Sequence, residues 1–331
     1  MTNPTGTEAA SRRGEDIDPE IRAFVRAMGA GWAAHPDLST VSPSEARRIA
    51  DAVREPWTRG GPAMTERAEA RIETKAGPVR VRRYVPVHGT PAPGLVWLHG
   101  GGWTIFSLDT HDRVMRELAA RSGVTVVGVD YALSPEAKHP IALGQSAAVL
   151  EELLAGRGGL GVDPARIAVG GDSAGANLSV AACLKLRDAG AERLPAAMAL
   201  VYGVFDRRSS PESAARYGGA GYMLGASEME QFWTSYLVDE RQAEDPLVCP
   251  VRADLAGLPP AFLTVPECDL LAEQSHAMAA RLRAHGVDAR LEVYPGATHS
   301  FLEAVAVSTL AGRALDDLAA WLRSALGLDG R

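Results

Sequence analysis

The sequence predicts an α/β protein with a mostly parallel central sheet, flanked by helices and covered by a helical cap. From about residue 70 onward, short apolar segments of strand character alternate with longer helical segments, which is typical of a doubly wound sheet. The 34 glycines suit the many tight turns that such a sheet requires. Two amphipathic helices before the first strand, and one interruption of the alternation, supply the expected cap.

The predicted elements follow in order along the chain. Strands are expected over residues 71–74, 79–87, 95–98, 124–129, 167–170, 198–204, 262–265 and 291–294. Helices are expected over residues 110–122, 141–154, 270–285 and 310–326, with a further buried helix beginning near residue 178. The expected domain organisation is a tail with cap helices over 1–69, a catalytic core over 70–205 and 259–331, and a cap insertion over 206–258.

The cap is expected to combine the two N-terminal helices with the insertion over residues 206–258. Asp18 and Pro19 provide the N-cap and the first position of a helix whose apolar residues recur on one face. A second helix is predicted to begin after Ser42, where residues 42–45 form a capping-box pattern. Residues 206–258 break the strand–helix alternation and contain an aromatic helix that is expected to cross the sheet edge. Residues 1–15 are polar and are expected to be disordered.

Composition excludes several classes of function. Hydrophobic residues make up 46% of the chain and charged residues 23%, so a sizeable core is expected. The net charge of −7 argues against nucleic acid or an anionic membrane surface as a partner. The three cysteines have no metal-binding spacing, so neither a metal nor a cofactor is expected. Without a signal-peptide pattern or an apolar run of about 18 residues, the expected location is cytoplasmic.

The stretch over residues 170–177 is the strongest local signal. A β-branched apolar run leads into Gly171-Asp-Ser173-Ala-Gly175, and a small-residue apolar run follows it. A strand that passes directly into a helix through Gly-x-Ser-x-Gly is the context of a nucleophile elbow. Ser173 would then stand at a helix N-terminus, where free N–H groups favour developing negative charge. The alternative is a glycine-rich turn with an incidental serine.

A nucleophilic serine needs a general base and an acid that orients the base. Ligand-binding residues in such sheets follow the carboxyl ends of strands. His299 follows the strand expected over 291–294, whereas His285 ends a helix. For the acid, Asp269 follows the strand expected over 262–265, and Asp206 is the second candidate. The nearby carboxylates that could substitute for it are Glu267 and Glu273.

A second glycine-rich loop follows the strand expected over 95–98. Its sequence is His99-Gly-Gly-Gly-Trp103, and three consecutive glycines allow backbone N–H groups to turn toward a ligand. A loop of this type forms half of an oxyanion hole, and the N–H after the nucleophile forms the other half. We therefore expect Gly101, Gly102 and Ala174 to donate to the oxyanion. The alternative, a phosphate-binding loop, lacks the spacing and the following Lys-Ser/Thr.

These motifs together resemble the hormone-sensitive-lipase-like esterases of the α/β-hydrolase fold. The resemblance rests on residues 99–102, 130–136, 171–175, 258–261 and 296–301, and it covers about residues 70–325. It implies Ser173, Asp269 and His299 as a catalytic triad and a cap built from the N-terminal helices and the later insertion. The sequence departs from the family pattern at Ala132, at Ala176 and in the segment after Asp269.

The expected substrate is a small-molecule ester. Trp103 follows the oxyanion loop and should crowd one side of the pocket. The roof would come from Phe24, Met28 and Trp32, or from Tyr222, Phe232 and Trp233. With 6% aromatic residues and no long apolar surface segment, a short acyl ester, including an acetyl ester, is expected over a long-chain lipid.

Three functions remain open at this stage. The first is a serine carboxylesterase that works through an acyl-enzyme, and the second is a non-catalytic ligand-binding relative, because the family includes hormone receptors. The third is acyl transfer or peptide cleavage with the same triad, which depends on what attacks the acyl-enzyme. A homodimer is expected only from the general frequency of dimers among soluble enzymes.

Overall fold

One twisted sheet runs through the molecule. The computed structural model describes residues 16–87, 89, 91–219 and 221–329, and within them eight strands pair in the order β1-β2-β4-β3-β5-β6-β7-β8. The pairs β1–β2 and β2–β4 are antiparallel, and every pair from β4 to β8 is parallel. The expected mostly parallel sheet is therefore confirmed. The strands are β1 Glu66–Ile72, β2 Val79–Val85, β3 Ala92–Leu98, β4 Thr125–Val129, β5 Val162–Asp172, β6 Ala197–Val201, β7 Ala261–Cys268 and β8 Ala289–Thr298.

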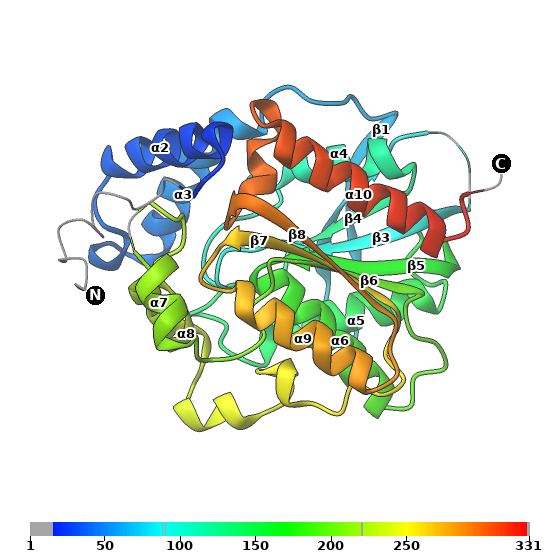
Figure 1. The fold of residues 1–331 in the computed structure, drawn as a ribbon. Coiled ribbons are helices and arrows are strands. Elements are labelled where there is room, and N and C mark those ends of the chain that lie inside the picture. The colour runs from blue at the N-terminus through cyan, green and yellow to red at the C-terminus, as the bar shows by residue number, and fades with distance from the viewer. Residues whose placement is uncertain (1–15, 88, 90, 220, 330–331) are drawn as a thin grey trace.

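Helices cover both faces of this sheet (Figure 1). Helices α4 and α10 lie on one face, and α5, α6 and α9 lie on the other. Their bounds are α4 Asp112–Ser122, α5 Ile141–Leu154, α6 Ala174–Asp188, α9 Ala272–Ala284 and α10 Thr309–Ala325. The strand–helix alternation predicted from the sequence is thus confirmed, with helix ends that differ by a few residues.

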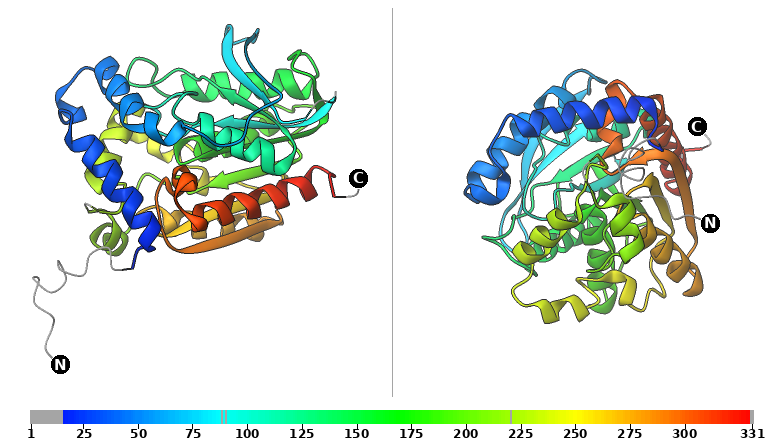
Figure 2. Two further views of the ribbon diagram at one scale, coloured as in Figure 1. Left: turned by 90° about the horizontal axis from the view of Figure 1, so that it is seen from above. Right: turned by 60° about the vertical axis from the view of Figure 1, so that its left-hand side comes forward.

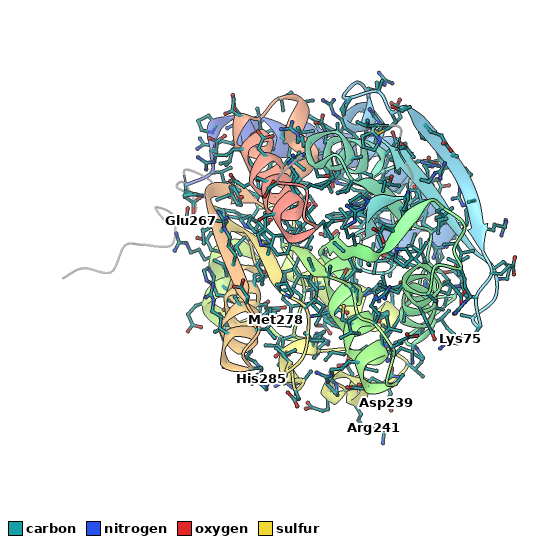
Figure 3. All side chains as sticks on the ribbon, turned by 90° about the vertical axis from the view of Figure 1, so that its right-hand side faces the viewer. Lys75, Asp239, Arg241, Glu267, Met278 and His285 are labelled. Carbon is teal, nitrogen blue, oxygen red and sulfur yellow. The ribbon has the colours of Figure 1, made fainter. Side chains whose placement is uncertain are left out.

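Burial on both faces explains why the central strands are continuous apolar runs. In β3, Val96 and Leu98 belong to the apolar cluster that includes α5, α6 and α9, whereas Leu95 and Trp97 belong to the cluster that includes α4 and α10. All four side chains are no more than 1% exposed. Figure 3 views the molecule from the end opposite the cap, and charged Lys75, Asp239 and Arg241 lie at its rim.

The cap lies at one end of the sheet (Figures 1 and 2). The helices at this end are α2 Pro19–Ala33, α3 Pro43–Thr58, α7 Pro211–Tyr217 and α8 Ala226–Tyr236. Two short 3₁₀ turns follow α8, η2 Glu240–Glu244 and η3 Pro250–Arg252, and η3 packs against α6 and α9. The Asp18 carboxylate accepts the N–H groups of Glu20 and Ile21, and the Ser42 hydroxyl accepts that of Glu45. Both predicted helix starts are confirmed.

The structure differs from the expectation mainly at the sheet edge. Strand β1 begins at Glu66, well before the predicted start at residue 71. Its side chains alternate between exposed and half-buried and many are charged, because an edge strand has one neighbour and one wet face. An apolar pattern does not detect such a strand. The tail expected to be disordered, residues 1–15, lies outside the described residues.

Candidate active site

Ser173 stands in a sharp turn between β5 and α6. Strand β5 ends at Asp172, α6 begins at Ala174, and Ser173 between them has φ 53° and ψ −115°. A non-glycine residue at positive φ is strained and persists where its surroundings hold it in place, which is common at functional sites. The turn leaves Ser173 7% exposed at the carboxyl end of a central strand.

Close packing against β3 explains the glycine two residues after Ser173. A Cβ added at Gly175 would lie 1.8 Å from the carbonyl oxygen of Leu98, the last residue of β3. No side chain fits at that distance, so the motif requires glycine there. The same contact places the loop that follows β3 directly beside the turn that carries Ser173.

A chain of hydrogen bonds joins three of the predicted site residues. His299 Nε2 lies 3.1 Å from Ser173 Oγ, and His299 Nδ1 lies 2.8 Å from Asp269 Oδ2. Asp269 is 0% exposed and His299 is 6% exposed. The three residues are separated by 126 and 30 positions in the sequence, and they follow the carboxyl ends of β5, β7 and β8. The structure therefore brings the predicted serine, histidine and acid together.

Burial and charge act in opposite directions on His299. Burial has the largest single effect and lowers the pKa of the imidazole, but the Asp269 carboxylate, with Asp172 and Glu228 farther away, more than offsets it, so the net pKa is raised above 6.5. Tyr202, at φ 36°, places its ring 4.8 Å from the His299 ring. Sequence reasoning missed Tyr202, although its place just after β6 was an available signal.

The rival candidates for the base and the acid have other partners. Asp206 forms an ion pair with Arg252 at 3.3 Å, and His285, at the end of α9 (Figure 3), pairs with Asp254 at 3.0 Å. The Glu267 carboxylate accepts a hydrogen bond from the N–H of Gly296. The Glu273 carboxylate accepts hydrogen bonds from the hydroxyl and the N–H of Ser210. Asp269 is thus the candidate acid that hydrogen bonds to His299.

The loop from His99 to Trp103 lies beside the turn that carries Ser173. Gly101 and Gly102 have φ of 105° and 56°. A Cβ added at Gly102 would lie 2.2 Å from the ring of Phe232, so a cap side chain covers this glycine directly. The loop and the N-terminus of α6, which begins at Ala174, therefore face a common site. The role of Gly101, Gly102 and Ala174 as oxyanion donors stays a prediction.

A buried ion pair connects the cap with the segment after His299. The Arg54 guanidinium of α3 lies 3.1 Å from the Glu303 carboxylate in the 3₁₀ helix η4 Phe301–Ala306, and both side chains are 4% exposed. Arg54 also stacks on Phe106 at 3.6 Å. Breaking one partner of a buried pair leaves an uncompensated charge, so this pair couples the position of α3 to the His299 segment.

The three predicted substrate-binding residues differ in their surroundings. Trp103 is 0% exposed and stacks on Tyr236 of α8 at 4.1 Å. Tyr222 is 4% exposed and donates its hydroxyl to Asp16, and the contact of either residue with a substrate stays a prediction. Both rings pack the cap, because aromatic side chains from distant segments cover one another there. Phe232, in contrast, covers Gly102.

A cavity of about 800 Å³ lies between the two parts of the cap. Trp32 lines it from α2, Met223 and Phe232 line it from the insertion, and Thr104 and Ile105 line it just after the oxyanion loop. Ser173 and His299 do not line this cavity. The ring of Phe232 lines the cavity and also covers Gly102, so it forms a wall between the cavity and the loop.

Among residues 16–87, 89, 91–219 and 221–329, no group of three or more His, Cys, Asp or Glu side chains is arranged to hold a metal ion. Within the same part of the chain, every helix is too short or too polar to cross a bilayer.

Known proteins resemble this chain in sequence and in fold. Residues 95–303 match a protein family described as the alpha/beta hydrolase fold. An acetyl esterase of Salmonella agona is 34% identical over 306 residues, which cover 91% of this chain and 92% of that protein. A hyperthermophilic esterase from Pyrobaculum calidifontis superposes with a TM-score of 0.85 at 30% identity, covering 93% of this chain and 98% of that one. An ester hydrolase from the metagenome of Lake Arreo, solved with a derivative of bipyridine phosphonate, superposes with a TM-score of 0.88 at 32% identity. The superposition covers 94% of this chain and 99% of that one.

The chain belongs to the hormone-sensitive-lipase-like family of α/β-hydrolases. Within that family it is a carboxylic ester hydrolase.

Proposed function

We propose that Ser173 is the nucleophile, His299 the general base and Asp269 the acid that orients the base. The observation that carries this proposal is the unbroken hydrogen-bond chain Asp269–His299–Ser173, with contacts of 2.8 and 3.1 Å. The serine hydroxyl is a weak nucleophile until an adjacent base removes its proton. The raised pKa of His299 supports a base that can hold that proton during the reaction.

The proposed reaction has two steps. Ser173 Oγ attacks the ester carbonyl carbon while His299 Nε2 takes the hydroxyl proton, and the tetrahedral oxyanion forms. Its collapse breaks the bond to the alcohol, which takes the proton from His299 and leaves the acyl group on Ser173. A water molecule then attacks the acyl-enzyme with His299 again as base, and the carboxylic acid leaves.

Backbone donors are proposed to stabilise the oxyanion. The N–H groups of Gly101 and Gly102 would approach from the loop after β3, and that of Ala174 from the N-terminus of α6. Support comes from the contact between the end of β3 and Gly175, which holds the two segments together. One such donor contributes about 3 kcal/mol to lowering the barrier.

The proposed substrates are esters of small molecules with short acyl groups, acetyl esters included. Phe232 occupies the space above Gly102, next to where the carbonyl carbon would bind, and so restricts the room for an acyl chain. The Salmonella relatives that carry the name acetyl esterase favour the same substrate class.

A cytoplasmic location, a homodimer and the boundaries of the cap insertion at 206–258 remain predictions.

A chain-length profile tests this proposal. We expect the purified protein to hydrolyse p-nitrophenyl acetate and butyrate, with a p-nitrophenol burst equal to the concentration of active sites where deacylation limits the rate. A p-nitrophenyl alkylphosphonate should inactivate it in a one-to-one ratio, and peptide mass mapping should place the adduct on Ser173. Absence of turnover on every chain length, or an adduct on another residue, would overturn the proposal.

Phe232→Ala is expected to shift the preference toward longer acyl chains. Removing the ring opens space above Gly102, so the ratio of kcat/KM for octanoyl over acetyl esters should rise roughly tenfold. The measurement is the same p-nitrophenyl ester series. Met229→Ala, on the same helix but buried in the core, is the matched control and should leave the ratio unchanged. An unchanged ratio in Phe232→Ala would remove Phe232 from the acyl pocket.

The pH profile should show the raised pKa of His299. The base must be neutral to accept the serine proton, and Asp269 stabilises the protonated ring. Therefore kcat/KM should fall as the pH decreases, with a midpoint above 6.5, since kcat/KM reports the ionisation of the free enzyme. Rates measured at the p-nitrophenol isosbestic wavelength avoid its own titration. A midpoint at or below 6.5 would contradict the role of Asp269.

A further inference from the structure

The residue before Ser173 uses both of its carboxylate oxygens. Asp172 is 4% exposed. Its Oδ1 accepts the backbone N–H of Gly100 at 3.1 Å, and its Oδ2 lies 3.1 Å from His111 Nε2. These partners are 72 and 61 positions away in the sequence. One side chain thus connects the Ser173 turn, the glycine loop and the start of α4.

The contact with Gly100 is tight. A Cβ added at Gly100 would lie 2.3 Å from Asp172 Oδ2 and 3.1 Å from the Asp172 carbonyl oxygen. The carbonyl of Gly100 lies 2.7 Å from His99 Nδ1, while the Tyr131 hydroxyl donates to the carbonyl of His99 at 2.6 Å. The first part of the glycine loop is therefore held on both sides, with the Asp172 carboxylate on one of them.

His111 holds the Asp172 carboxylate from the other side. Its Nδ1 lies 2.9 Å from the Thr110 hydroxyl, which donates its own proton to the carbonyl of Ser107. Both ring nitrogens of His111 thus face acceptors, and this arrangement fits the doubly protonated ring. Burial has the largest single effect on His111 and lowers its pKa, but Asp172, with Glu303, more than offsets it, so the net pKa is raised above 6.5. Burial likewise raises the pKa of Asp172, but His111, with His99 and His299, more than offsets it, so the net pKa is lowered below 3.8.

We infer that Asp172 and His111 are positioning residues that hold the two halves of the oxyanion hole in register. This inference rests on the proposed function. Gly100 precedes the loop donors, and Asp172 lies two residues before the third donor, Ala174, so the contact between them sets the spacing of all three. A charged acceptor holds an N–H group more strongly than a neutral one. A shift of about 1 Å in such a constellation costs about 100-fold in rate.

Two substitutions of Asp172 separate positioning from bulk stability. Asp172→Ala leaves the N–H of Gly100 without its acceptor, so kcat per active site should fall about 100-fold while KM stays within about threefold. Asp172→Asn keeps an oxygen for Gly100 and an amide for a neutral His111, so it should recover most of that loss, to within about tenfold of wild type. Active sites are counted by phosphonate titration, which removes the effect of misfolded protein. A kcat for Asp172→Ala within threefold of wild type, or no recovery in Asp172→Asn, would overturn the inference.

His111→Gln provides a second variant if Asp172→Ala does not fold. Glutamine can donate to Asp172 but carries no charge, so kcat should fall about tenfold without a matching rise in KM. His285→Gln is the control, because His285 also pairs with a carboxylate, that of Asp254 at 3.0 Å, and lies at the end of α9, away from the loop (Figure 3). It should leave kcat per active site unchanged. Equal kcat losses in both variants would assign His111 to stability alone.

Amide hydrogen exchange gives a readout that does not depend on ester turnover. Peptides covering residues 99–106 should exchange faster in Asp172→Ala and His111→Gln than in wild type, whereas in His285→Gln they should exchange at the wild-type rate. Equal protection in all four proteins would overturn the positioning role. If wild type hydrolysed no ester, the proposed function would fail, and the exchange rates would still decide whether Asp172 holds the loop.

Discussion

Ser173→Ala is expected to lower kcat for p-nitrophenyl acetate by about 10⁶-fold, which leaves at most slow hydrolysis promoted by binding and the oxyanion donors. The reason is that Ser173 Oγ is the atom that forms the acyl-enzyme, and alanine offers no atom in its place. The measurement is steady-state and single-turnover kinetics on the same preparation. The burst of p-nitrophenol and the labelling by a p-nitrophenyl phosphonate should both disappear.

The fold should survive this substitution. The Ser173 hydroxyl has one described side-chain partner, His299 Nε2 at 3.1 Å, and the backbone N–H of Ser173 still donates to the carbonyl of Val201. Far-UV circular dichroism and Tm should therefore remain close to those of wild type. A correctly folded Ser173→Ala protein that kept more than about 1% of the wild-type kcat would show that another group is the nucleophile.

The core of this fold is readable from local sequence for a physical reason. A parallel strand with helices on both faces is apolar at every position, as in β3, where Leu95 to Leu98 are all buried. Strand β1 gives no such signal, because one face is wet and it has a single neighbour. The sequence pattern therefore predicts the centre of the sheet better than its edge.

The triad candidates were predictable because topology places them. Ser173, Asp269 and His299 each follow a strand, and parallel strands end at the same edge of the sheet, where their following residues meet. Neither Asp172 with His111 nor Arg54 with Glu303 carries a comparable pattern. Each pair joins segments that are distant in the sequence and that meet only when the helices pack. The sequence alone therefore does not indicate which residues pair.

The cap was predicted least well. Its helices begin where Asp18 and Ser42 indicate, since capping is a local effect. Which aromatic ring faces the substrate depends instead on how the N-terminal helices and the insertion meet. Trp103 is an example, because its ring stacks on Tyr236 of the insertion, a contact that no local sequence pattern indicates. Phe232, one turn earlier on the same helix as Tyr236, covers Gly102.

Asp269→Asn is expected to lower kcat by about 10⁴-fold. The carboxylate holds the Nδ1 proton of His299 and stabilises the imidazolium that forms when Ser173 is deprotonated. Asparagine removes that charge and can present its amide N–H to Nδ1, which forces the wrong tautomer. Burial would then be opposed only by the more distant Asp172 and Glu228, so the pKa of His299 should fall, and the midpoint of the residual kcat/KM profile should move to lower pH.

Asp206→Asn is the matched control for this substitution. Asp206 also lies just beyond a strand, but its carboxylate pairs with Arg252 at 3.3 Å and is partly exposed, so the charge contributes little there. We expect its kcat to stay within about threefold of wild type, because an exposed ion pair contributes about 1 kcal/mol or less. Kinetics on both variants, normalised by phosphonate titration, make the comparison. If Asp206→Asn abolished activity while Asp269→Asn kept it, the acid would be Asp206, and the hydrogen bond between Asp269 and His299 would have no part in catalysis.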